Sequence, residues 1–96
     1  MDLKDYCFDG EGALHLDELP HSAREAGVDK EQRPAYEART AENLARIAAL
    51  QEKLYAEGRE GLIVLLQAMD AAGKDSVIKH VMGAVNPQGV DVVSFK

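Results

Sequence analysis

Apolar residues follow two different spacings along this chain. Between residues 34 and 57 they recur three or four positions apart, which is the spacing of one face of an α-helix. Pro34 suits the first position of that helix, and Gly58 suits its end. We therefore predict a helix over 34–57 that packs one face on a sheet, or that mainly makes a dimer contact. The apolar positions are Leu44, Ile47, Leu50 and Leu54.

The second spacing begins at residue 62. Leu62–Leu66 is a continuous apolar run, typical of a parallel strand that is covered on both faces. The next apolar residues fall on one helical face, which predicts a helix over 74–85. Asn86-Pro-Gln-Gly89 has strong turn chemistry, and the residues over 90–95 suggest a second strand. The pattern predicts an α/β fold with one right-handed βαβ unit. The apolar residues of this helix are Val77, Ile78, Val81, Met82 and Val85.

The first 32 residues show little periodicity and carry most of the acidic charge. They hold three basic and nine acidic residues, which accounts for the net charge of −6. Ser22-Ala-Arg-Glu25 fits a helix capping box, although no apolar run follows it. We predict an acidic, loosely ordered arm over 1–32 with one short helical turn. A helix and connector over 33–61 and a partial domain over 62–96 follow it.

Composition and charge exclude several classes of protein. A surface that binds nucleic acid is normally basic, whereas this chain of 96 residues is acidic. Cys7 has no second cysteine with which to pair, so no disulfide forms within the chain. No apolar run approaches the roughly 20 residues of a membrane span. We expect a cytoplasmic protein that binds neither nucleic acid nor membrane, and we assign no metal role to His15 or His21.

The loop between the first apolar run and the following helix carries the candidate chemistry. Ala68-Met-Asp-Ala-Ala-Gly-Lys74 partly matches the phosphate-loop pattern Gly-x-x-x-x-Gly-Lys-Ser/Thr. Gly73 and Lys74 fit, Ala68 replaces the first glycine, and Asp75 replaces the hydroxyl residue. Such a loop turns backbone N–H groups inward, and the helix N-terminus adds positive potential. A simple turn with a solvated lysine is the alternative.

Several segments resemble the family-2 polyphosphate kinases. Gln67–Ser76 resembles the Walker A region of that family, in which an aspartate lies inside the loop. The likeness covers about residues 50–96. Its other segments are Leu54–Gly58, Ile78–Met82, Asn86–Gly89 and Ser94–Lys96.

This resemblance implies a three-layer α/β/α sandwich of the P-loop NTPase type around a parallel sheet. It implies phosphoryl transfer, with Mg²⁺, between inorganic polyphosphate and a nucleoside mono- or diphosphate (ADP/AMP or GDP/GMP). Lys74 would hold the transferring phosphates and Asp70 would bind the Mg²⁺, so these two are the candidate catalytic residues. The candidate phosphate-binding residues are Met69, Ala71, Ala72, Gly73, Lys74, Asp75, Ser76 and Lys79.

The family pattern is only partly present. Its second acidic motif, its arginine-bearing lid and its further strands have no counterpart here, so we expect the N-terminal portion of the domain, inactive alone. The longer form is expected to be a homo-oligomer. Two other readings stay open. One is a different P-loop kinase that uses ATP on a small metabolite, and the other is a non-catalytic fragment that assembles with a partner.

Overall fold

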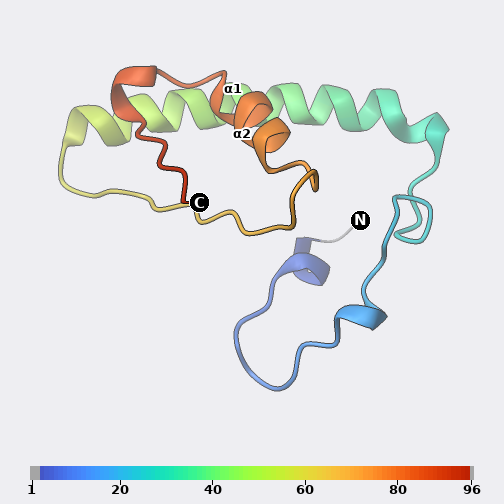
Figure 1. Cartoon of the computed structure of the whole chain (residues 1–96). Coiled ribbons are helices and arrows are strands. Elements are labelled where there is room, and N and C mark those ends of the chain that lie inside the picture. The colour runs from blue at the N-terminus through green and yellow to red at the C-terminus, as the bar shows by residue number, and fades with distance from the viewer. Residues whose placement is uncertain (1–2, 96) are drawn as a thin grey trace. The chain divides into compact units, whose positions relative to one another are not determined.

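The computed structural model describes residues 3–95, and its two long elements are α-helices (Figure 1). Helix α1 spans Arg33–Glu57 and helix α2 spans Lys74–Met82. The contacts divide the chain into two units, Met1–Glu37 and Ala38–Lys96, and α1 begins in the first and continues in the second. Four short 3₁₀ helices complete the described elements: η1 (Leu3–Tyr6), η2 (Leu16–Glu18), η3 (Lys30–Gln32) and η4 (Pro87–Gly89).

Helix α1 confirms the predicted helix over 34–57 to within one residue. Its first turn is closed by an exposed pair in which Arg33 Nε donates to Glu37 Oε1 at 2.7 Å. The Glu37 carboxylate raises the pKa of the Arg33 guanidinium. At the other end, Gly58 has φ of +65° and its N–H bonds to the Leu54 carbonyl at 3.2 Å. A left-handed residue just past a helix is readily supplied by glycine, so Gly58 ends α1 as predicted.

Helix α2 and the turn after it also follow the local sequence. The helix begins at Lys74 as predicted, but it ends at Met82 rather than at residue 85. The turn η4 is capped by Asn86, whose side-chain oxygen accepts from the Gln88 N–H at 3.1 Å. Pro87 occupies the first position of this turn, where its fixed φ suits the geometry. The predicted Asn-Pro-Gln-Gly turn is therefore present.

A direct contact joins α1 to this turn within the second unit. Gln51 Nε2 donates to the Asn86 carbonyl at 3.2 Å, across 35 positions of sequence. A Cβ at Gly89 would collide with Gln51 Nε2 and would lie 3.3 Å from Tyr55 Cδ2. The absence of a side chain at Gly89 thus allows α1 to approach the turn. On α1, the face around this contact is partly buried at Leu44, Ala48, Gln51 and Leu54.

The predicted parallel sheet is wrong for the described residues. Neither Leu62–Leu66 nor residues 90–95 form a strand, and the fold over residues 3–95 is helical (Figure 1). An apolar run records a preference for burial, whereas a strand also needs a second backbone that pairs with its N–H and C=O groups. The two runs do not pair with each other, so no βαβ unit or α/β/α sandwich forms.

The second unit consequently has very little core. Val85, 7% exposed, is the one buried hydrophobic residue among the described residues. Helix α1 was expected to cover a sheet, but its contact is with the η4 turn instead. The half-buried residues of α2 and of the segment after it, Ile78, Val81, Met82 and Val90, supply the rest of the apolar contact. No helix among residues 3–95 is long and apolar enough to cross a membrane.

The first unit is held by short-range hydrogen bonds. The predicted capping box is present, because Glu25 N–H bonds to Ser22 Oγ at 3.2 Å and His21 N–H bonds to Glu25 Oε2 at 2.7 Å. The residues that follow form a turn and not a regular helix. A second local pair precedes α1, where Asp29 N–H bonds to Gln32 Oε1 at 2.9 Å. These contacts order the arm locally without giving it a core.

Candidate phosphate-binding site

The loop over 68–74 closes on itself through its own backbone. Ala72 N–H bonds to the Met69 carbonyl at 3.2 Å, and Ala71 N–H bonds to Asp70 Oδ1 at 3.1 Å. Ala71 and Gly73 have positive φ angles of +60° and +98°. Ala68, which stands at the first glycine position of the pattern, is not among the residues with positive φ, so its Cβ adds no backbone strain there. The loop is thus a compact turn that leads into α2.

Gly73 makes the change from loop to helix. It is the N-cap of α2, its φ is +98°, and its carbonyl accepts from the Val77 N–H at 3.0 Å. A Cβ built at Gly73 meets nothing within 4 Å, so the constraint on this position comes from the backbone angle alone. The free N–H groups of the first turn of α2 therefore lie directly after the loop, and they give this end a positive potential.

Lys74 fastens the start of the loop to its end. Its ammonium Nζ donates to the Ala68 carbonyl at 2.9 Å and contacts the Met69 carbonyl at 3.4 Å. The side chain is half-buried, unlike the fully exposed lysine of the alternative reading. An ammonium group has three donors, so one N–H remains for an anion while two hold the loop. Lys74 can therefore shape the loop and also supply its positive charge.

The loop and the start of α2 enclose a hollow of about 170 Å³. Asp70 and Asp75 both line it, beside Gly73 and Lys74. One oxygen of Asp70 is engaged by the Ala71 N–H, and its other oxygen is left for a ligand. No group of three or more His, Cys, Asp or Glu side chains that could hold a metal occurs within residues 3–95. The complete lining is Asp70, Ala71, Ala72, Gly73, Lys74, Asp75 and Ser76.

Two of the residues assigned to phosphate binding lie outside this hollow. Met69 is 84% exposed, and its contribution is the carbonyl oxygen that accepts from Ala72 and Lys74. Lys79 is exposed on α2 and does not line the hollow. The structure thus brings six of the eight assigned residues together with Asp70.

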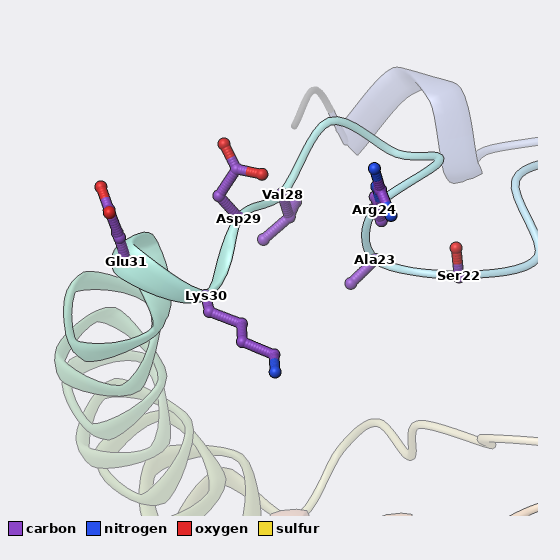
Figure 2. A pocket seen from close by; sticks show the side chains of 7 residues that line it. All are labelled: Ser22, Ala23, Arg24, Val28, Asp29, Lys30 and Glu31. Carbon is purple, nitrogen blue, oxygen red and sulfur yellow. The ribbon is translucent and has the colours of Figure 1, made fainter.

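A larger hollow of about 640 Å³ lies in the first unit (Figure 2). Its polar groups do not converge on one point: Lys30 points to the opposite side from Asp29 and Glu31. Its lining residues other than Val28 are exposed. A binding site needs a few polar groups directed at a shared ligand, so this hollow carries no function. The complete lining is Ser22, Ala23, Arg24, Val28, Asp29, Lys30 and Glu31.

Residues 30–96 match the family model described as polyphosphate kinase 2. The match spans more than half of the chain and contains the whole loop and helix α2. The chain belongs to the polyphosphate kinase 2 family. The resemblance carried by the loop and by the Asn-Pro-Gln-Gly turn is thereby confirmed, and the family is one of kinase-type enzymes.

Two characterised bacterial proteins are similar to this chain. The ADP-polyphosphate phosphotransferase of Rhodopseudomonas palustris is 55% identical over 51 residues, which is 53% of this chain and 18% of that protein. The AMP/ADP-polyphosphate phosphotransferase of Meiothermus ruber is 58% identical over 50 residues, which is 52% of this chain and 19% of that protein. The matched segment thus spans about a fifth of each relative. No solved structure matches the chain significantly.

Sequence reasoning missed two features of this part of the polyphosphate kinase 2 chain. The first is the bond from Lys74 to the loop carbonyls, because the pattern assigns that lysine to phosphate alone. The second is the contact of Gln51 with Asn86 and Gly89, which lie 35 and 38 positions away. A polar residue on the otherwise apolar face of α1 was the signal available for Gln51.

Proposed function

We propose that this chain supplies the phosphate-binding loop of an enzyme that transfers a phosphoryl group between inorganic polyphosphate and a nucleoside mono- or diphosphate. The observation that carries the proposal is the closed loop over 68–74. In it, Gly73 has positive φ at the start of α2 and Lys74 reaches back to the Ala68 carbonyl. The names of the two relatives, which specify polyphosphate with ADP or AMP, support these substrates.

The roles of the residues follow from their places in the hollow. Backbone N–H groups at the start of α2 would bind phosphate oxygens, and the helix dipole adds to the attraction. Lys74 would neutralise charge on the bound phosphates, since it already lies at the lip of the loop. Little general-base chemistry is needed, because a nucleotide phosphate is an anionic nucleophile already. Positioning and charge neutralisation are then the main sources of catalysis.

The residues of the hollow also fit a magnesium ion that arrives with its phosphates. Mg²⁺ keeps several waters and binds through one or two carboxylates together with substrate phosphates. Asp70 and Asp75 supply two carboxylates on the same hollow, and Asp70 has one oxygen free of the Ala71 N–H. Asp70 would bind the ion directly or through water. The ion would supply charge neutralisation between neighbouring phosphates.

A binding competition tests the proposal and separates it from an ATP-dependent P-loop kinase. The purified chain is titrated with fluorescently labelled polyphosphate in the presence of Mg²⁺. Unlabelled polyphosphate and unlabelled ATP then compete at equal phosphate concentration. Displacement by polyphosphate, and weaker displacement by ATP, is the expected result. Tighter binding of ATP, or binding that a Gly73→Ala variant leaves unchanged, contradicts the proposal.

A further inference from the structure

The apolar run Leu62–Leu66 is exposed along its whole length. Leu62, Ile63, Val64 and Leu65 are 79%, 91%, 66% and 78% exposed, and Leu66 is 39% exposed. Alternate residues of an extended chain point to opposite sides, so both sides of this run are apolar. Monomeric proteins rarely leave a contiguous apolar surface of this kind uncovered.

The backbone of the run is unpaired as well. Residues 62–66 belong to no helix or strand, and Figure 1 draws them as a plain tube between α1 and the loop. Their N–H and C=O groups point outward in two rows, which only another extended backbone can satisfy along its length. The run contains no charge and no proline, which are the features that normally prevent such pairing.

We propose that two copies of this chain pair through Leu62–Leu66 as antiparallel strands around a two-fold axis at Val64. This goes beyond the proposed function and does not depend on it. A two-fold pairing is closed, because the same surface is used on both copies. In it, Val64 lies opposite Val64, Ile63 lies opposite Leu65 and Leu62 lies opposite Leu66.

Charge selects the antiparallel arrangement over the parallel one. In a parallel pair in register, Glu60 of each copy lies beside Glu60 of the other, and Asp70 lies beside Asp70. Like charges directly opposite each other destabilise a strand pair. In the antiparallel pair centred on Val64, Glu60 lies opposite Ala68 and Asp70 lies opposite Gly58. Each carboxylate then faces an uncharged residue.

The available area predicts a weak, concentration-dependent dimer. A large aliphatic side chain offers on the order of 100 Å² of apolar surface. With the exposed fractions above, the five residues of the run contribute on the order of 400 Å² per copy. That is about half of the roughly 800 Å² per partner of a standard interface, and it falls in the range of transient contacts.

Sedimentation over a wide range of concentration tests the proposal. The wild-type chain is expected to sediment faster as its concentration rises. Val64→Lys places two like charges on the two-fold axis, and it is expected to weaken association on the order of 100-fold. Leu16→Lys is the matched control, since Leu16 is 67% exposed and lies outside the run. A wild-type chain that stays monomeric, or equal effects of the two variants, overturns the proposal.

Disulfide trapping tests the register. In a Cys7→Ser background, Val64→Cys places two thiols opposite each other, within the Cβ separation that allows a disulfide after a small adjustment. Leu62→Cys places its two thiols four residues apart along the pair, about 13 Å. Mild oxidation is expected to cross-link the Val64→Cys chain and to leave the Leu62→Cys chain uncross-linked. Equal cross-linking of both variants indicates a parallel or unspecific pairing and overturns the antiparallel assignment.

Discussion

Replacing Lys74 by alanine is the perturbation that most directly tests the candidate site. The change removes a half-buried ammonium group from the hollow, together with its bonds to the Ala68 and Met69 carbonyls. A lysine and a phosphate at about 4 Å attract by about 1 kcal/mol in bulk water and about 4 kcal/mol at an effective dielectric of 20. The partly buried position of Lys74 places its contribution between these limits, at about 2 kcal/mol.

A loss of about 2 kcal/mol corresponds to roughly 30-fold weaker binding of polyphosphate. Fluorescence polarisation with labelled polyphosphate measures this ratio directly. The matched control is Lys79→Ala, which removes an exposed lysine of the same helix that lies outside the hollow. Its contribution is limited to about 1 kcal/mol at most and is screened by salt, so an effect of roughly fivefold or less is expected.

A second variant separates the charge of Lys74 from its mechanical role. Lys74→Gln loses the charge but keeps an N–H donor that can turn toward the loop carbonyls. Its affinity is expected to fall as far as that of Lys74→Ala, while hydrogen exchange in residues 68–74 stays closer to that of wild type. If Lys74→Ala and Lys79→Ala weaken binding equally, Lys74 has no special place in the site and the assignment is wrong.

Three further predictions concern the loop, the turn and turnover. Gly73→Ala is expected to cost about 1–2 kcal/mol, because its φ is +98° and no neighbour obstructs a Cβ, whereas Ala71→Gly relieves a positive φ; hydrogen exchange of α2 compares them. Gly89→Ala is expected to cost about 1 kcal/mol by displacing the Gln51 amide from the Asn86 carbonyl, and much less in a Gln51→Ala background, in thermal melts followed by circular dichroism. The purified chain is expected to form no measurable nucleotide from polyphosphate, because no arginine lines the hollow and arginine contributes on the order of 10³–10⁵ in rate; clear turnover would refute this.

The elements that were predicted well are those fixed by neighbours in sequence. Helix α1, its end at Gly58, the start of α2 at Lys74 and the turn capped by Asn86 all follow from caps, glycine positions and a helical spacing of apolar residues. Each of these signals acts within about four residues. Such local rules are satisfied within this chain whether or not a larger core forms around them.

The strands failed for the complementary reason. The apolar run at Leu62–Leu66 was read as a buried strand, but burial and pairing are supplied by other segments, and its own residues cannot specify them. The described residues provide no backbone beside it, and Val85 alone is buried. The expected sheet therefore depended on contacts at long range, which a pattern read along one chain does not contain.

The candidate site lies on the local side of this division. Its three closing hydrogen bonds join Ala72 to Met69, Ala71 to Asp70 and Lys74 to Ala68, and all of them lie within seven residues. The loop consequently takes up its turn without support from a sheet, and its binding of an anion requires only the start of α2 in addition. Catalysis differs, because stabilising the transferring phosphoryl group needs charges from several directions around it. Anion binding and turnover are thus separable in this family, and the matched segment carries the structural basis of the first.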